Sequence, residues 1–516
     1  MADELITPGL QTSPMFRVKG QMSRWRYPDQ RLTPENPTLL TNVNLTERGQ
    51  AATRFGYRPY NSVVLPSSAP AVGFKQITFP GNSVREVVPT SSKIYADDGT
   101  TRTVLTGDAL TAGNDDYARI IYLQKKAILN NGVDQIQLWD GNLANNFADM
   151  TGMPWTKAQD IVAHKGVLVV LRPTITVDGA AVEFPTRFYW SDIERKTYQV
   201  DIETWLETNR TELYEGGAPI IGAVDNWGLL WIAKEDGMYT GKVVNQTGRL
   251  EYEFGEEFKG FSPVAKHALL ARPEFVFGVA KEGPFVFRRD GSFSIITEDI
   301  QDEWNSLNQS RLQFAQARIR EKDRQVRLRV SSAANSNGHD KELVWDWITN
   351  DVWFDETTDA MNYCEQVTVS NIELDLLAGF DGFLYKGNES SQLTDNGASF
   401  EWRIKMQPND LGHPGKTKEI QFIRTYVRSK PSSQSIALTV NLDQGEQISR
   451  TATLSAGGAL NYNNAHTYNS GLGYPGGTNE KLDFWVNRQC RNFQPQWSGT
   501  DPSDIAGYDV IYRIVE

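Results

Sequence analysis

The five histidines of the chain are the first residues to consider for metal binding or general acid–base chemistry. They are His164, His267, His339, His413 and His466, and no two of them are three or four residues apart. Two metal ligands on one face of a helix need that spacing. The sequence therefore contains no local histidine motif for a metal ion.

The two cysteines, Cys364 and Cys490, are far apart in the sequence and cannot form a local site. We expect each to be a small buried side chain, because a reactive thiol needs an accessible and electropositive environment. Two cysteines also cannot build a disulfide framework. This predicts assembly in a reducing compartment.

Neighbouring carboxylates are the third candidate, because a pair of acids can hydrolyse a glycosidic bond. Such pairs occur at Asp97–Asp98, Asp115–Asp116 and Glu256–Glu257. They fall in expected turns, where aspartate commonly caps backbone N–H groups, and we favour capping over catalysis. No nucleophile-elbow, dinucleotide-binding or P-loop motif occurs. The sequence predicts a protein that is not an enzyme and has no catalytic residue, cofactor or metal.

Arginines gather near the N-terminus, at Arg26, Arg31, Arg48, Arg54 and Arg58. One interpretation is a charged docking face for another subunit, since arginine is favoured at protein interfaces. The other is a solvated loop. The sequence leaves both open, and we take the five arginines as candidate interface residues.

The elements that position these residues are mostly strands. From residue 61 to residue 395, short runs of Val, Ile, Leu, Tyr, Phe and Trp alternate with turn clusters. This pattern is typical of antiparallel strands joined by hairpins, which we expect at 234–237, 281–283, 288–291 and 348–351. Helical spacing is scarce, with candidates only at 202–209 and 300–317.

A loose strand-plus-Asp/Gly repeat recurs through the same region, for example at 136–141, 285–291 and 379–387. Its spacing of roughly 35–60 residues suits blades of four short strands. The repeat favours an all-β fold with an irregular β-propeller of about five to seven blades. A row of β-sandwiches would give the same strand pattern and is the alternative.

Composition divides the chain into three expected parts. Residues 1–60 are rich in proline and weakly periodic, which predicts an extended N-terminal docking arm. A polar stretch at 390–399 ends the propeller region of residues 61–395. Alternating strands then predict a C-terminal antiparallel β-sandwich-like domain at 396–516, with a long Gly/Asn/Tyr-rich loop at 454–479.

The charge balance argues against some classes of function. The chain has 52 Lys+Arg and 64 Asp+Glu, a formal charge of −12. This argues against a reader of nucleic acid, which needs a basic stripe to neutralise phosphates. No apolar run reaches the ~18 residues of a membrane helix, and the N-terminus lacks a signal-peptide pattern. We expect a soluble protein without stable membrane insertion.

The segment NVNLTERGQAATRFGY resembles the N-terminal region of tail proteins from short-tailed bacteriophages. The matching residues are Asn44, Gly49, Arg54, Gly56 and Tyr57.

Two further segments are similar to blades of the same proteins. The first matches at His164, Pro185, Tyr189, Ser191 and Asp192, and the second is VWDWITNDVWF.

The resemblance implies a structural virion protein, the tail nozzle or tail hub. Such proteins contain β-propellers and form a ring, commonly a homohexamer, below the adaptor ring of the portal. The ring extends the DNA ejection channel and offers a platform for tail fibres or tailspikes. DNA passes through it without sequence-specific binding. The resemblance therefore implies a location in the virion tail after assembly in the host cytoplasm.

Larger members of that family carry inserted domains that this chain lacks, so the surface that would receive fibres stays open. Two alternatives remain. One is a fibre-adaptor or receptor-binding tail protein. The other is a propeller glycosidase that acts on a glycan of the host surface.

Overall fold

The computed structural model describes residues 10–515 without 18–36, 46–50, 61–63, 66–68, 82, 98–100, 106, 109, 195–198, 214–216, 247–248, 370–371, 388, 390–391, 429–432, 444, 455–459, 462–466 and 469–478. The fold is all-β, as expected. It has two compact units: unit 1 comprises Met1–Gly56, Leu343–Thr358 and Glu389–Glu516, and unit 2 comprises Tyr57–Glu342 and Asp359–Asn388.

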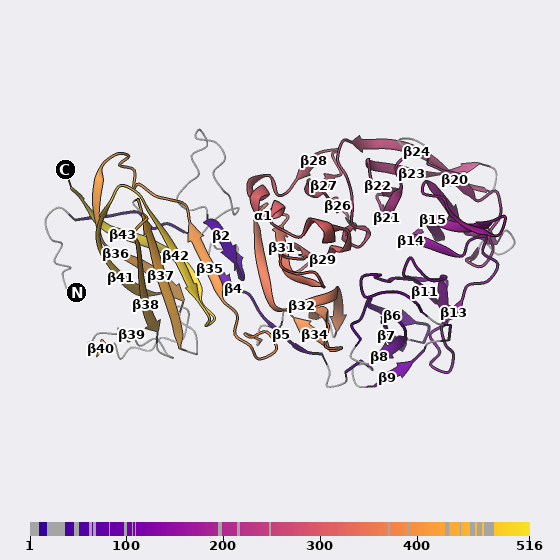
Figure 1. Cartoon of the computed structure of the whole chain (residues 1–516), viewed down its shortest axis with the longest axis horizontal. Coiled ribbons are helices and arrows are strands. Elements are labelled where there is room, and N and C mark those ends of the chain that lie inside the picture. The colour runs from indigo at the N-terminus through magenta and orange to yellow at the C-terminus, as the bar shows by residue number, and fades with distance from the viewer. Residues whose placement is uncertain are drawn as a thin grey trace. The chain divides into compact units, whose positions relative to one another are not determined.

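Unit 2 is an irregular β-propeller whose first five blades are antiparallel sheets in chain order, each with four strands in its main path and one further strand in the third. Figure 1 shows these blades following one another around a common centre. Their strands are β6 (Lys75–Phe79), β7 (Ser83–Pro89), β8 (Ile94–Asp97) and β9 (Arg102–Val104); β10 (Arg119–Leu123), β11 (Lys126–Asn130), β12 (Gln137–Trp139) and β13 (Ala148–Asp149); β14 (Lys157–His164), β15 (Val167–Val177), β17 (Arg187–Trp190) and β20 (Arg210–Glu212); β21 (Ile220–Asn226), β22 (Leu229–Lys234), β23 (Gly237–Gln246) and β24 (Arg249–Lys259); β25 (Leu270–Arg272), β26 (Phe275–Ala280), β27 (Gly283–Arg288) and β28 (Phe293–Ile295).

Short elements accompany these blades. They are β16 (Ala180–Glu183) beside β15, the hairpin of β18 (Asp192–Glu194) and β19 (Gln199–Asp201), the helix α1 (Gln301–Asn305), and the 3-10 turns η2 (Lys266–Ala268), η3 (Glu298–Ile300) and η4 (Gln309–Phe314). None of the helices in the described ranges combines the length and the apolar character that crossing a bilayer requires.

Two more groups of strands complete the propeller. The sixth contains β29 (Gln316–Arg320), β30 (Gln325–Val330) and the start of β31 (His339–Asp346). The seventh contains the second half of β32 (Val352–Val369), then β33 (Ile372–Gly379), β34 (Leu384–Gly387) and β5 (Tyr57–Pro59). Since β5 precedes the first blade in sequence but pairs with β34, the two ends of the propeller segment meet in one sheet.

The alternation of side chains between the two faces of each strand explains how the blades pack. In β11, Ala127 and Leu129 belong to the apolar cluster shared with the first blade, whereas Ile128 belongs to the cluster shared with the third. In β22, Ile232 and Trp231 divide in the same way between the third and fifth blades. Successive strand residues point to opposite faces, so a strand buried on both faces is apolar throughout.

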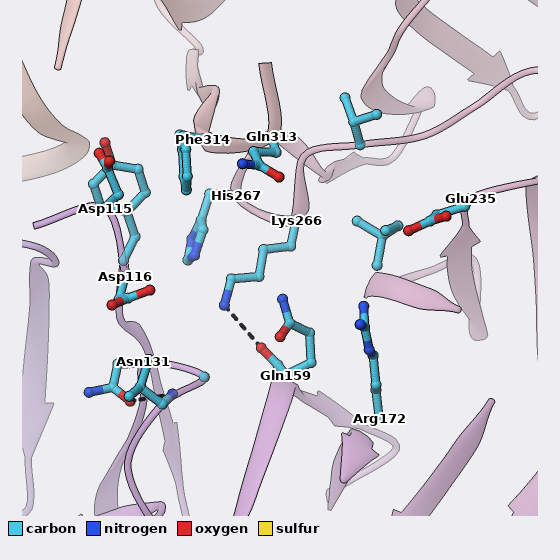
Figure 2. A pocket seen from close by; sticks show the side chains of 15 residues that line it. Asp115, Asp116, Asn131, Gln159, Arg172, Glu235, Lys266, His267, Gln313 and Phe314 are labelled. Atoms are coloured by element: carbon cyan, nitrogen blue, oxygen red, sulfur yellow. Dashed lines mark hydrogen bonds between the residues drawn. The ribbon is translucent and has the colours of Figure 1, made fainter. Parts of the chain in front are cut away.

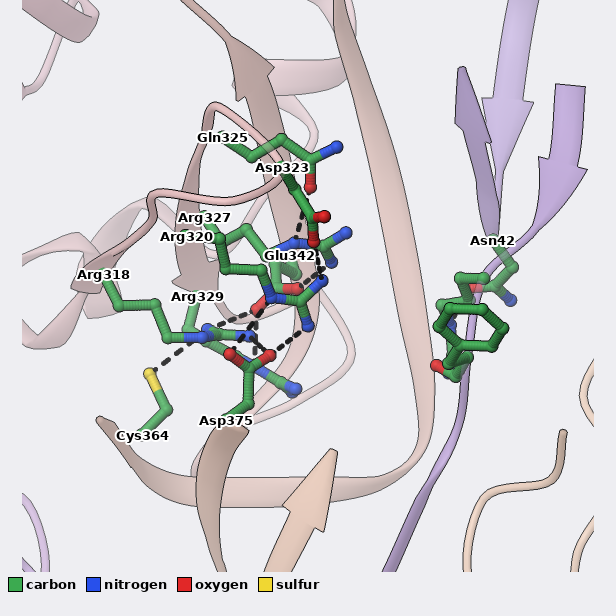
Figure 3. Close-up of polar contacts among 12 residues, drawn as sticks. Asn42, Arg318, Arg320, Asp323, Gln325, Arg327, Arg329, Glu342, Cys364 and Asp375 are labelled. Carbon is green, nitrogen blue, oxygen red and sulfur yellow. Dashed lines mark hydrogen bonds and ion pairs between the residues drawn. The ribbon is translucent and has the colours of Figure 1, made fainter. Parts of the chain in front are cut away.

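The sixth and seventh groups meet through charges. Arg318 and Arg320 of β29 share one sheet face with Arg327 and Arg329 of β30, and Arg318 lies directly opposite Arg327 in the strand register. Like charges directly opposite each other destabilise a sheet unless they are countered. Figure 3 shows the four side chains converging on two carboxylates.

Those carboxylates are Glu342 of β31 and Asp375 of β33. Glu342 lies 2.5 Å from Arg318 and 2.7 Å from Arg327, and Asp375 lies 2.8 Å from Arg318 and also pairs with Arg320. Burial alone would raise the pKa of both carboxyls, but the arginines outweigh it and hold both pKa values below their usual range. Both acids are therefore charged inside the protein.

Unit 1 is a β-sandwich-like pair of sheets. In β37 (Gln434–Leu442) every second side chain is buried, the pattern of a strand with one face in a core. Trp497 of one sheet is fully buried and donates a hydrogen bond to Thr425 of the other at 2.9 Å. The first sheet contains β3 (Val43–Leu45), β4 (Ala51–Thr53), β43 (Asp504–Val515), β36 (Thr417–Arg428) and β41 (Asn479–Cys490), with β1 (Gln11–Thr12) beside β43, and the second contains β2 (Pro37–Thr41), β35 (Trp402–Met406), β42 (Phe493–Gly499), β37, β38 (Gln447–Leu454), β39 (Leu460–Asn461) and β40 (Thr467–Tyr468).

The divisions in the structure differ from those expected. Described residues before position 57 supply strands of unit 1 and do not form a separate arm, and residues 343–358 also belong to unit 1. The prolines permit this, because Pro37 begins β2 and Pro59 ends β5, positions that tolerate a missing N–H. The last passage between units falls between Asn388 and Glu389 instead of after residue 395.

The local expectations had mixed outcomes. The four expected hairpins are present. The expected helix at 202–209 is wrong, since this segment forms turns, whereas α1 and η4 lie within 300–317. Of the expected loop at 454–479, the structure describes β39, β40 and the ends of β38 and β41; the rest lies outside the described residues.

Replacing Asp375 by asparagine tests the ionic contact between the sixth and seventh groups. We expect the D375N variant to lose about 3–5 kcal/mol of unfolding free energy, because it leaves buried arginines without their counter-charge. The matched control is Glu203→Gln, which removes the exposed partner of Lys126 and should cost less than about 1 kcal/mol. Urea unfolding followed by tryptophan fluorescence measures both. Equal small losses would contradict this account.

Candidate functional site

The structure separates the arginines that were expected to form a docking face. Arg26, Arg31 and Arg48 lie outside the described residues. Arg54 is only 5% exposed, inside unit 1, whereas Arg58 is exposed on β5 of unit 2. For Arg54 the expectation needs correction, because its side chain is committed to the interior of unit 1. Arg58 keeps the exposure that a docking residue requires.

All three guanidinium nitrogens of Arg54 donate hydrogen bonds to groups of unit 1. Its two terminal nitrogens bind Asp395 at 2.9 and 2.7 Å, and its Nε donates to Asn42 at 2.8 Å. The guanidinium also lies over the Phe400 ring, 3.8 Å from the centroid. Asp395 is fully buried and receives a further hydrogen bond from the Thr358 backbone at 3.1 Å. A bidentate pair of this kind fixes both position and orientation.

Gly56 and Tyr57 follow this ion pair and are equally constrained. A Cβ atom on residue 56 would overlap the backbone carbonyl of Thr394, so only glycine fits there. Tyr57 is 2% exposed, and its hydroxyl donates to Asp359 at 3.0 Å. Three residues of the N-terminal motif thus occupy positions that demand their types. Gly49 of the same motif lies outside the described residues.

The propeller has a polar cavity near its axis, which we call the axial cavity. It measures about 350 Å³. Figure 2 shows side chains from several blades and turns reaching into it. Its lining residues are Asp115, Asp116, Tyr117, Asn131, Gly132, Val133, Gln159, Arg172, Ile221, Glu235, Val264, Lys266, His267, Gln313 and Phe314. The inner strands of a propeller converge on its axis, so residues far apart in sequence meet there.

An ion network supports the wall of the axial cavity. Asp160 of β14 is fully buried and lies 3.0 Å from Nε of Arg119, whose other nitrogens donate to the carbonyls of Ala223 and Lys266. Lys266 donates from Nζ to the Gln159 carbonyl at 2.9 Å. Burial lowers the pKa of Lys266, and it raises the pKa of Asp160 more than Arg119 and Lys266 lower it.

Tyr117 occupies the axis beside the cavity. It is 1% exposed and makes ring contacts with His267, Phe314, His339 and Tyr363, which come from four different elements. Burial, followed by the charge of Asp115, raises its pKa far above the ordinary value, so the phenol stays neutral. The propeller axis is therefore filled by side chains at this level.

Two histidines beside Tyr117 are held neutral. Burial, and then the guanidiniums of Arg311 and Arg329, lower the pKa of His339 to about 3. Its Nε2 donates to the Phe314 carbonyl at 2.9 Å. Burial, and then Lys266 and Arg119, lower the pKa of His267 well below its ordinary value. Near neutral pH both rings are uncharged hydrogen-bonding groups.

Four other candidates for chemistry have structural roles, whereas Asp98 and His466 lie outside the described residues. Asp115 pairs with Arg311 at 2.6 Å, and Asp116 accepts a hydrogen bond from the Gly113 backbone, which supports capping. Burial raises the pKa of Cys364 to about 11 and that of Cys490 to about 12, so neither presents a thiolate. Among the described residues, no group of three or more His, Cys, Asp or Glu side chains is placed to hold a metal ion.

Sequence analysis missed both polar clusters. Arginines two residues apart on two neighbouring strands, at 318, 320, 327 and 329, indicate one charged sheet face, and that pattern was visible in the sequence. The residues of the axial cavity carry no such pattern. Lys266 and His267 lie in a short 3-10 turn between blades, and only the closed propeller brings them beside Gln159.

No protein-family model matches the chain, and no curated protein matches it. Among solved structures, the WD40 domain of Neurospora crassa Pan2 is 9% identical, covers 68% of this chain and 100% of its own, and gives a TM-score of 0.39. The extracellular domain of the putative hybrid two component system BT4673 of B. thetaiotaomicron is 8% identical, covers 68% and 44%, and gives 0.41. The propeller assignment rests on the strand pairing described above.

A pair of arginine substitutions tests the different environments of Arg54 and Arg58. We expect Arg54→Leu to cost about 3–5 kcal/mol of unfolding free energy, because Asp395 would be left as an unpaired buried charge. The same change at the exposed Arg58 should cost less than about 1 kcal/mol. Chemical denaturation of both variants provides the comparison. A small loss for Arg54→Leu would show that the ion pair is not required for unit 1.

Acidification should destabilise the propeller through His267 and His339. Their pKa values are lowered in the folded state, whereas unfolded histidine titrates near pH ~6.5. The unfolded chain therefore binds protons that the folded chain does not, and stability falls as pH drops below ~6.5. His164, whose pKa burial also lowers, adds to the effect. Each such group contributes up to about 1.4 kcal/mol per pH unit. Urea unfolding between pH 7 and 5 measures the slope, and His339→Gln should reduce it by roughly a third.

Proposed function

We propose that the chain is a subunit of a ring that forms the tail nozzle, or tail hub, of a short-tailed bacteriophage. In this role it extends the DNA ejection channel below the adaptor ring and offers a platform for tail fibres or tailspikes. The proposal rests first on the resemblance of the segment around residues 42–57 and of two blade segments to such proteins. The propeller and the sandwich-like unit are each built of packed sheets, which suits a structural part.

The observation that carries the proposal is the way the N-terminal motif is built into the fold. Arg54, Gly56 and Tyr57 match the motif, and each occupies a position that tolerates little else: a buried bidentate ion pair, a backbone approach without room for Cβ, and a buried tyrosine with a bonded hydroxyl. The coincidence of the motif with these three constrained positions supports the proposal.

A DNA channel would have to lie between subunits. Tyr117 and its four ring neighbours fill the axis of the propeller, so no duplex can pass through one subunit. Several copies around a common duct would provide the passage, which agrees with a hexameric ring. At a formal charge of −12 per copy, such a duct would repel phosphates and let DNA slide without binding.

The exposed edge of the seventh blade is a candidate contact between neighbours in the ring. In the described sheet, β5 pairs only with β34, which leaves its other edge without a strand. Arg58 is exposed at the centre of β5. Edge strands offer backbone groups to a partner, and an exposed arginine suits an interface.

Electron microscopy of the purified chain, alone and mixed with the phage adaptor protein, tests the proposal. We expect rings with sixfold symmetry in one of the two samples. Arg58→Glu should reduce the ring fraction several-fold, whereas Arg289→Glu, the same charge reversal on an exposed turn of the fifth blade, should leave it unchanged. Trimers would favour a fibre-adaptor or receptor-binding protein. Monomers in both samples would refute the nozzle assignment.

A further inference from the structure

The axial cavity has features of a binding site that a structural ring subunit does not need. Its volume of about 350 Å³ lies at the lower end of the range for small-molecule sites, about 300–1,000 Å³. All of its lining residues belong to unit 2, and they come from different blades and turns. A site assembled in this way is held in place by the whole propeller.

The chemistry of the lining is mixed. Figure 2 shows Lys266, Gln159 and Arg172 converging on one space, with Asp116 on one side of it and Glu235 on the other. These side chains supply amine, amide and guanidinium donors together with carboxylate and amide acceptors. Phe314 adds an aromatic ring to the wall. Both donors and acceptors thus line a single small volume.

Part of this hydrogen-bonding capacity is unused. Nε2 of His267 is buried and has no hydrogen-bond partner among the described residues, and the imidazole lies beside Lys266 in the cavity wall. The ammonium of Lys266 has three donors, and one of them meets the Gln159 carbonyl. Buried polar groups are nearly always paired in folded proteins. A ligand that offers both an acceptor and a donor would complete this wall.

The charges exclude other ligand classes. Asp115 is paired with Arg311, and Arg172 is paired with Glu183, so the other charged side chains of the lining are Lys266, Asp116 and Glu235. One ammonium against two carboxylates does not favour a phosphate group, which would require an excess of donors and positive charge. Nor do the described residues provide a cluster that could hold a metal ion. A neutral molecule with many hydroxyl groups fits the remaining chemistry.

We propose that the axial cavity binds a single saccharide residue, with its hydroxyl groups bonded by Lys266, Gln159 and Asp116 and one face of the ring against Phe314. Each hydroxyl both donates and accepts, which matches a lining that contains both donors and acceptors. The proposal goes beyond the nozzle assignment and does not depend on it. The sugar is either a free monosaccharide or the terminal residue of a glycan, and the two share this chemistry.

Ligand-observed NMR on the full chain tests the proposal. The probes are glucose, galactose, mannose and N-acetylglucosamine, each as the free sugar and as its methyl glycoside, which imitates a glycan end. We expect at least one probe to bind with a Kd of about 1 mM, the range open to so small a ligand. Binding of the methyl glycoside identifies a glycan end, and binding of the free sugar alone identifies a monosaccharide. No binding of any probe would overturn the proposal.

Three variants locate the site. Lys266→Met should weaken binding by about tenfold or more, because it removes a charged donor. Lys281→Met, on an exposed turn of the same blade, is the matched control and should leave the Kd unchanged. Gln313→Trp should block the cavity from an exposed position of its rim without touching the ion network beneath, so it serves if Lys266→Met does not fold. Binding that persists in both cavity variants would overturn the assignment of the site.

Discussion

The ion network of β29, β30, β31 and β33 is the contact on which closure of the propeller depends. Five other contacts between blades are made by apolar clusters, which tolerate small shifts of one sheet against the next. The contact between the sixth and seventh groups places four arginines against Glu342 and Asp375 in the interior. Buried charges are costly unless every partner is in place, so this contact accepts one arrangement only. Charge pairing fixes how the last blades pack against each other, whereas the other blades pack through apolar side chains that fill the space between sheets.

The same constraint, the cost of a buried charge without a partner, applies to the side chains at the propeller axis. Blades of short strands that pack face to face around a centre leave room there, and any side chain in that room loses contact with water. Tyr117 fills part of the space with ring contacts to four neighbours, and Asp160 is paired with Arg119 where an isolated charge would be costly. The volume that remains is lined by polar groups, with Asp115 paired to Arg311 and Arg172 paired to Glu183. It has no excess of positive charge, which restricts the class of ligand that it can hold.

The sequence predicted features that depend on neighbouring residues. It did not predict features that depend on residues far apart in the chain. Runs of β-branched and aromatic residues with Asp/Gly turns predicted the strands, the hairpins and the propeller with its sandwich-like companion. The partner of β5 could not be predicted, because the pairing of Tyr57 with Gly387 joins residues that no short motif connects. Arg54 was taken for a surface residue for the same reason: nothing near it in sequence indicates Asp395. The turns at 202–209 imitate a helix because Ile202 and Trp205 have helical spacing, yet both pack on the second and third blades.

A filled propeller axis changes how a ring of such subunits must work. If DNA passes between copies, the outer surfaces of the units make the channel wall. The interior of each propeller then does not line the channel. The axial cavity is then free to serve another purpose without interfering with ejection. The two proposals place their functions on different surfaces of one subunit, an outer face for assembly and an interior for a small ligand. A substitution in the cavity wall can therefore remove ligand binding while ring formation continues, and a change at β5 can do the reverse.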